Sequence, residues 1–161
     1  MKIRILGSGT STGVPQIGCT CPVCTSADPK DNRLRTSAIV ETGDARILID
    51  CGPDFRTQVL RLPFERIDGV LITHEHYDHV GGLDDLRPFC RFGAVPIYAE
   101  EYVARALRLR MPFIRCAPCS SRSSTCSEPR CQRQMCIMRS APGTEECWPA
   151  SAGGCIRKRC C

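Results

Sequence analysis

The feature that most constrains this chain is a short apolar run that ends abruptly in potential metal ligands. Val70, Leu71 and Ile72 precede the polar segment 73–79, and that segment contains all three histidines of the 161-residue sequence. A short apolar run of this kind is typical of a buried strand that opens into a loop. Because α/β folds hold their reactive side chains in such loops, we expect the functional site at the end of this strand.

Four residues of the segment have side chains that bind divalent metal ions: His74, His76, Asp78 and His79. Histidine together with carboxylate suits Zn²⁺, and Mn²⁺ or Fe²⁺ is also compatible. The spacing can begin two adjacent metal sites, and two metals about 3.5–4 Å apart can bridge a hydroxide that attacks an ester, amide or phosphodiester. The alternative, a polar loop whose histidines bind nothing, is disfavoured by the density of ligands.

Length and hydropathy indicate one domain. At 161 residues the chain suits a single domain with its own core. No stretch approaches the roughly 20 apolar residues needed to cross a bilayer, and residues 1–6 lack the apolar core of a signal peptide. We therefore expect a cytoplasmic protein without a membrane partner, and the sequence leaves the oligomeric state open.

Composition divides the chain into two parts. Residues 1–115 carry fifteen Lys and Arg against fourteen Asp and Glu, whereas residues 116–161 carry seven against three, together with nine of the fourteen cysteines. The second part has no Leu, Val or Phe, so it cannot offset the entropy of ordering its backbone. We predict a folded domain over 1–115 and an irregular or disordered tail over 116–161. A zinc module in the tail is disfavoured, because Cys116 and Cys119 form its only Cys-x₂-Cys pair.

The residue pattern over 1–115 predicts a sheet with helices packed against it. A helix that begins at Leu83 is expected to be interrupted or kinked by Pro88. Strands first, followed by strand–helix alternation, indicate the α+β class. The other expected elements are strands at 2–6, 36–41, 46–50, 70–72 and 95–99 and helices at 55–62 and 100–110.

Two further segments carry weaker signals. The glycine-rich loop 7–13 could hold a phosphate with its backbone N–H groups, but its glycine spacing does not match a nucleotide-binding fingerprint, so a tight turn is the favoured interpretation. Cys19, Cys21 and Cys24 suggest a structural zinc site, because close-set thiols in a reducing compartment favour metal over disulfide. Such a site needs a fourth ligand, which the sequence does not identify, so small half-buried thiols remain the alternative.

Asp50 lies at the end of the strand expected at 46–50, directly before Cys51, Gly52 and Pro53. A carboxylate at a strand end beside a forced turn favours a role in the site. An aspartate that only caps the turn would have the same sequence signature, so both interpretations remain open.

Three motifs together resemble the metallo-β-lactamase superfamily. Residues 73–82 resemble its metal-binding motif, and residues 47–52 resemble its upstream aspartate motif. Residues 7–15, with the three cysteines that follow, are similar to the branch that contains the phosphoribosyl cyclic phosphodiesterase of phosphonate breakdown. The resemblance covers about residues 1–114.

The resemblance implies an αββα sandwich, of which this chain holds about the N-terminal half. It implies that His74 and His76 bind a first metal, that Asp78, as a catalytic residue, and His79 bind a second, and that Asp50 supports them by orienting a histidine. It further implies two catalytic Zn²⁺ ions, with Mn²⁺ possible, and a structural zinc on the three cysteines.

The remaining ligands of such a centre are expected from histidines and an aspartate in the second half, and this sequence has no histidine after His79. A change of reading frame near residues 110–115 would explain both this departure and the composition of the tail. On that hypothesis the tail is out of frame, and the chain is truncated, poor in metal and inactive.

Three classes of function follow. The first is a metal-dependent hydrolase that cleaves a small cyclic or nucleotide-like phosphodiester with a metal-bridged hydroxide. The second is a nuclease resembling the tRNA 3′-processing enzyme, but the balanced charge of residues 1–115 disfavours a nucleic-acid partner. The third is a non-enzymatic, cysteine-rich protein that binds zinc or nucleic acid through its basic tail.

Overall fold

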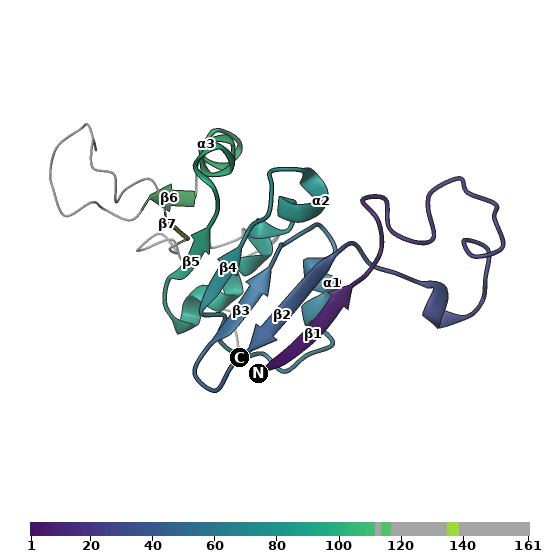
Figure 1. The fold of residues 1–161 in the computed structure, drawn as a ribbon, viewed down its shortest axis with the longest axis horizontal. Helices are drawn as coiled ribbons and strands as arrows, with labels where there is room; N and C mark the ends of the chain where they lie inside the picture. Colours follow the sequence, from purple (N-terminus) through teal and green to yellow (C-terminus); the bar gives the residue numbers. More distant parts are fainter. Residues whose placement is uncertain (112–113, 117–134, 139–161) are drawn as a thin grey trace, which may run out of the picture.

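The computed structural model describes residues 1–111, 114–116 and 135–138 (Figure 1). Within this part of the chain the strands form one seven-stranded sheet in the order β1-β2-β3-β4-β5-β7-β6. The strands are β1 (Lys2–Gly7), β2 (Ser37–Glu41), β3 (Arg46–Ile49), β4 (Gly69–Leu71), β5 (Val95–Tyr98), β6 (Ile114–Cys116) and β7 (Met135–Met138). The helices are η1 (Pro29–Asp31), α1 (Phe55–Val59), α2 (Tyr77–Val80), η2 (Leu83–Phe92) and α3 (Glu101–Arg110). This is the mixed α+β arrangement that the sequence predicts.

Strand direction determines which connections meet. β2 is antiparallel to both β1 and β3, and β3 is parallel to β4, which is parallel to β5. The carboxyl ends of β1, β3, β4 and β5 therefore lie at the same edge of the sheet. The loops that leave β1, β3 and β4 all begin at this edge, which is the region where open α/β sheets bind ligands.

The strands expected at 36–41 and 46–50 are observed as β2 and β3, which form a hairpin. Glu41 pairs with Arg46 at its closed end, and the Thr42 N–H donates to the Ala45 carbonyl at 2.8 Å. The Thr42 hydroxyl also accepts from the Ala45 N–H at 3.1 Å, which fixes the turn. The hairpin places the end of β3, and with it Asp50, at the sheet edge where β1, β4 and β5 also end.

One face of the sheet is covered by helices and forms the core. Ile39, Leu48, Val70 and Ile97 lie side by side across β2 to β5, and each is at most 1% exposed. Phe55, Leu83, Leu86 and Leu107 from the helices join them in one buried cluster. This cluster anchors β3 and β4, the strands that carry the candidate site.

The opposite face is apolar and open in the described residues. Ile5, Ala38, Ile49, Leu71 and Tyr98 form one register-matched row across β1 to β5. Ile5 is 64% exposed and Leu71 43% exposed, and in Figure 1 no helix lies in front of β1 to β4. An apolar sheet face needs a second layer to cover it, as in the αββα sandwich that the family resemblance implies.

Two predicted elements differ from those observed. The segment after Gly82 forms η2, a ten-residue 3₁₀ helix that continues through Pro88. Its buried residues Leu83, Leu86 and Phe89 recur every three positions, which is the period of a 3₁₀ helix and aligns them on one face. The helix expected at 55–62 ends at Val59.

The tail boundary predicted at 115/116 falls inside β6. Cys116, at the end of β6, and β7 are the described parts of the expected tail, and its other residues lie outside the described chain. In the described residues, no helix is both long and apolar enough to span a membrane.

Candidate metal centre

Asp50 occupies an unusual backbone position at the end of β3. Its φ is +56°, in the left-handed region that non-glycine residues rarely adopt, although aspartate tolerates it better than most. The Asp50 N–H still donates to the Leu71 carbonyl at 2.8 Å, and the residue is only 2% exposed. The turn directs the Asp50 carboxylate toward the loop that follows β4.

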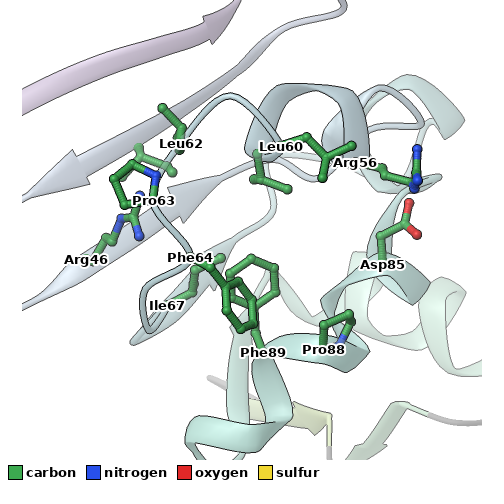
Figure 2. A pocket seen from close by; sticks show the side chains of 12 residues that line it. Arg46, Arg56, Leu60, Leu62, Pro63, Phe64, Ile67, Asp85, Pro88 and Phe89 are labelled. Atoms are coloured by element: carbon green, nitrogen blue, oxygen red, sulfur yellow. The ribbon is translucent and has the colours of Figure 1, made fainter. Parts of the chain in front are cut away.

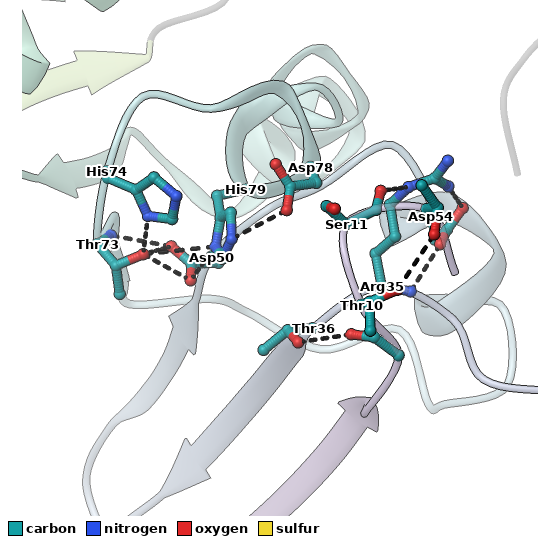
Figure 3. Close-up of polar contacts among 12 residues, drawn as sticks. Thr10, Ser11, Arg35, Thr36, Asp50, Asp54, Thr73, His74, Asp78 and His79 are labelled. Carbon is teal, nitrogen blue, oxygen red and sulfur yellow. Dashed lines mark hydrogen bonds and ion pairs between the residues drawn. The ribbon is translucent and has the colours of Figure 1, made fainter. Parts of the chain in front are cut away.

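The Asp50 carboxylate receives several hydrogen bonds from the segment after β4 (Figure 3). The Thr73 N–H donates to Oδ1 at 2.9 Å, and the Thr73 hydroxyl lies 2.9 Å from Oδ2. His79 Nδ1 lies 2.7 Å from Oδ2. The carboxylate therefore ties both ends of the histidine segment to β3.

These contacts determine which histidine nitrogens are available. An ionised carboxylate only accepts hydrogen bonds, so His79 Nδ1 and the Thr73 hydroxyl must both donate to Asp50. The hydroxyl has one proton, so Thr73 Oγ1 accepts from His74 Nδ1, which lies 3.0 Å away. His74 and His79 thus keep a proton on Nδ1, and Nε2 of each is left as the potential ligand atom.

His79 and Asp78 present their ligand atoms to each other. His79 Nε2 lies 3.1 Å from Asp78 Oδ2, and both side chains are more than four-fifths buried. Two lone-pair atoms at this distance repel unless a proton or a metal ion lies between them. Two ligands of one Zn²⁺, each about 2.0–2.2 Å from it, would lie roughly 3–3.5 Å apart, so the spacing fits a shared metal ion.

The other two histidines lie next to this pair. The ring centroids of His74 and His79 are 3.9 Å apart, and those of His74 and His76 are 4.7 Å apart. His76 caps α2, with its carbonyl accepting the His79 N–H at 2.9 Å. The four predicted ligands therefore lie on one short segment beside Asp50, with His79 facing Asp78 and the His74 ring next to the rings of His76 and His79. Within the described chain, no three of their ligand atoms lie within 4.8 Å of one another.

Two residues of the site were not among the predicted site residues. Thr73 links Asp50 to His74 by hydrogen bonds. Its position directly before the first histidine is the feature of the sequence that could have identified it. Gly52 lets the β3 loop pass against α2, because a Cβ there would lie 2.0 Å from the Asp78 carbonyl oxygen. The Cys51 N–H donates to the His79 carbonyl at 2.7 Å on the same segment.

The loop is also held from α3. Arg110 Nη1 donates to the Glu75 carbonyl at 3.1 Å. Because Glu75 lies between His74 and His76, this bond restrains the backbone that carries both histidines.

The three predicted zinc thiols also converge. In the part of the chain that is described, Cys19, Cys21 and Cys24 are the one set of three or more potential ligands whose atoms all lie within 4.8 Å of one another. The Cys24 N–H lies 3.5 Å from Cys21 Sγ, and this contact, with the neighbouring thiols, lowers the pKa of Cys21 from 9.0 to about 7. The Gln16 N–H lowers the pKa of Cys24, but burial and the adjacent thiols outweigh it and raise that pKa.

Cys51 lies directly behind the centre and differs from these thiols. It is fully buried, and burial, with the charges of Asp85 and Asp50, raises its pKa well above the ordinary value. A neutral thiol at this position acts as a packed apolar group rather than as a metal ligand.

A cavity of about 320 Å³ lies on the helix-covered side of the sheet (Figure 2). Its walls include Ile39, Ile67, Phe64 and Phe89, and none of the predicted metal ligands lines it. The cavity is therefore separate from the candidate metal centre.

Comparison with known proteins identifies the family. Residues 45–126 match the family described as Beta-lactamase superfamily domain. The chain belongs to the metallo-β-lactamase superfamily. The resemblance inferred from residues 47–52 and 73–82 is thereby confirmed at the level of the superfamily.

Several relatives of this metallo-β-lactamase chain are known. A solved structure described as a new diphosphatase from the PhnP family is 48% identical, with a TM-score of 0.65 over 69% of this chain and 46% of that one. Zn²⁺-bound PqqB from Methylobacterium extorquens is 30% identical, with a TM-score of 0.57 over 66% of this chain and 40% of that one. An octanoyltransferase of Porphyromonas gingivalis is 52% identical over 115 residues, which are 71% of this chain and 23% of that protein.

This chain thus spans less than half the length of each of these relatives. The PhnP-family likeness agrees with the branch suggested by residues 7–15. The PqqB relative binds Zn²⁺, and the imidazole of His79 and the carboxylate of Asp78 are donor types that suit this ion.

Proposed function

We propose that this chain carries part of a metal-dependent centre that hydrolyses a phosphodiester or a related diphosphate bond, most simply in a small cyclic or nucleotide-like substrate. The observation that carries the proposal is the donor arrangement around His79: its Nε2 lies 3.1 Å from Asp78 Oδ2, its Nδ1 lies 2.7 Å from Asp50, and its ring centroid lies 3.9 Å from that of His74. The 48% identity to a protein described as a diphosphatase supports the substrate class.

In this proposal His74 and His76 hold one metal, and Asp78 and His79 hold another. Asp50 orients His79 directly and His74 through Thr73. When bound, such metals supply Lewis-acid chemistry, because they lower the pKa of a water toward about 7 and neutralise charge on phosphoryl oxygens. The protein contributes ligand orientation, which the buried Asp50 carboxylate fixes before any substrate arrives.

A complete two-metal centre needs more ligands than these four. The sequence has three histidines, all of them within residues 74–79. We therefore infer that this chain alone binds metal weakly at the histidine segment and turns over slowly. For Cys19, Cys21 and Cys24 we propose a structural Zn²⁺ that stabilises the loop between β1 and β2.

The test compares two matched aspartate variants of the full chain. Asp78→Asn removes a proposed ligand, and Asp44→Asn removes an exposed carboxylate in the β2–β3 turn. Mn²⁺ affinity is measured by electron paramagnetic resonance, because Mn²⁺ prefers nitrogen and oxygen ligands and avoids the thiols. Hydrolysis is measured with bis(p-nitrophenyl) phosphate, with p-nitrophenyl phosphate and a tRNA precursor as alternative substrates.

We expect Asp78→Asn to lower Mn²⁺ affinity about tenfold or more and to remove the metal-stimulated diester hydrolysis, while Asp44→Asn changes neither. Equal hydrolysis by both variants contradicts the proposed centre. Preferential cleavage of the tRNA precursor replaces the small-diester proposal with a nuclease. Tight binding of two metals with rapid turnover contradicts the inference that these four ligands bind metal only weakly.

A further inference from the structure

The loop that leaves β1, residues 8–12, has no role in the proposed metal centre. It nevertheless begins at the same sheet edge, because β1 and β3 run in the same direction on either side of β2. Asp50 leaves this edge after β3, and the histidine segment leaves it after β4. Three loops therefore share one edge, and the proposed centre uses only two of them.

Loop 8–12 is held by hydrogen bonds to residues 34–36. The Gly9 N–H donates to the Leu34 carbonyl at 2.8 Å, and the Thr36 hydroxyl donates to the Gly9 carbonyl at 2.9 Å. A Cβ at Gly9 would lie 2.5 Å from the Arg33 carbonyl oxygen, so glycine is what allows this close approach. Arg35 Nε donates to the Ser11 carbonyl at 2.8 Å, which holds the tip of the loop.

The same arginine connects the loop to the metal centre. Arg35 Nη1 pairs with Asp54 Oδ1 at 2.9 Å. Asp54 follows Gly52 by two residues, and Gly52 packs on the Asp78 carbonyl. In the view of Figure 3, Ser11 projects between the Asp78 and Asp54 side chains. Ser11 is thus linked through Arg35 and Asp54 to the loop that packs on Asp78.

The chemistry of the loop suits an anion. Thr10, Ser11 and Thr12 are all exposed, and among the described residues no hydrogen bond to the Ser11 hydroxyl is found. The sequence contains no Asp or Glu before Asp28. Arg33 places Nη1 3.5 Å from the Ser8 hydroxyl and forms no ion pair within the described part of the chain. Hydroxyl and backbone donors beside an unpaired arginine are the groups that hold phosphate.

We propose that loop 8–12, together with Arg33, binds a phosphate group of the substrate that does not react, and so positions the reacting phosphorus over the histidine segment. This assignment rests on the proposed function for its place in catalysis, but the binding itself can be measured separately. It implies that preferred substrates carry a second phosphoryl group beyond the bond that is cleaved.

The test is an NMR titration of the full, metal-free chain with inorganic pyrophosphate. We expect amide shifts at residues 8–12 and at Arg33. Arg33→Gln is expected to weaken binding about tenfold, because it removes a charged hydrogen-bond donor to the phosphate. Ser11→Ala is expected to weaken it severalfold. Thr57→Ala and Arg61→Gln, which alter exposed residues outside loop 8–12, are matched controls and should leave the binding unchanged.

Shifts confined to the histidine segment, equal weakening by Arg61→Gln, or no binding up to about 10 mM pyrophosphate overturn the proposal. The two proposals fail in different ways. If pyrophosphate binding depends on Arg33 but Asp78→Asn does not change hydrolysis, the proposed metal centre is contradicted and the phosphate-binding loop is supported. If Asp78→Asn removes hydrolysis but pyrophosphate does not bind loop 8–12, only the loop assignment is contradicted.

Discussion

Asp50 is the residue through which the backbone of β3 controls the chemistry of the β4 loop. Its left-handed backbone brings one buried carboxylate within hydrogen-bond distance of both Thr73 and His79. Such a conformation costs of order 1–3 kcal/mol, and it persists where surrounding contacts hold it. Here the bonds to Thr73 and His79 hold it, and the result is two histidines with a defined tautomer.

The sequence predicted a site role for Asp50 but not its geometry. A carboxylate at a strand end is visible in the sequence, whereas its partners Thr73 and His79 lie 23 and 29 residues further on. Those contacts depend on the parallel register of β3 and β4, which no local pattern fixes. The four proposed metal ligands were easier to single out because they are close together in the sequence.

Cys21 gives a prediction at the residue scale. Its pKa, lowered to about 7, means that the reactive thiolate is the main form above that pH. We expect alkylation of Cys21 by iodoacetamide in the metal-free chain to rise with a midpoint near pH 7. Buried Cys51, whose pKa is raised, should stay unmodified in the same sample.

Zinc should protect Cys21, and the protection should weaken as the pH falls below about 7, because protons then compete with the metal. Peptide mapping by mass spectrometry separates the two cysteines. An alkylation midpoint near the ordinary value of 9.0 would show that the contacts from Cys24 and Cys19 do not act on Cys21.

At the scale of elements, periodicity explains which predictions succeeded. The hairpin strands β2 and β3 and the helix α3 follow the expected patterns closely. η2 was misjudged because Pro88 was given more weight than the three-residue repeat of Leu83, Leu86 and Phe89. The short helix α2 was not foreseen, since its four residues, Tyr77–Val80, are too few to show a helical period.

The packing of α2 on the β3 loop gives a prediction at this scale. Gly52→Ala would place a Cβ 2.0 Å from the Asp78 carbonyl oxygen, so the loop and α2 must move apart. We expect a loss of about 2 kcal/mol or more in the free energy of unfolding, together with weaker Mn²⁺ binding.

Gly43→Ala is the matched control, because a Cβ there meets nothing within 4 Å. Urea unfolding measures the stability of both variants, and electron paramagnetic resonance measures Mn²⁺ binding. Equal stability of the two variants would mean that α2 is free to shift, which would contradict the close packing of Gly52 on Asp78.

At the scale of the whole molecule, the described residues form one sheet with helices on one face and an apolar face left open on the other. Helices bury the row that contains Leu48 and Val70, while the row that contains Ile5 and Leu71 stays open in the described residues. The residue pattern predicted the strands. It could not show which face of the sheet the helices would leave uncovered, because the strands are apolar on both faces. Exposed apolar patches of this kind promote association.

We therefore expect the chain to associate in a concentration-dependent way and Ile5→Lys to reduce that association. Leu109→Lys is the control, since Leu109 is 83% exposed on α3 and lies outside the open face. Sedimentation velocity over a concentration series measures the effect. If the wild-type chain stays monomeric at all concentrations, or if both variants change its association equally, the exposed sheet face does not mediate association.

The reliance of His79 on Asp50 has a consequence for the order of folding. The four proposed ligands occupy six consecutive positions, but the Asp50 carboxylate that holds His79 lies 29 residues earlier and reaches it only across the finished β3–β4 pair. Closing such a long-range contact is slow compared with forming local structure. In the unfolded chain the proposed ligands are therefore close in sequence but not correctly oriented. We expect the metal to bind after β3 and β4 have paired, so metal binding should not nucleate folding.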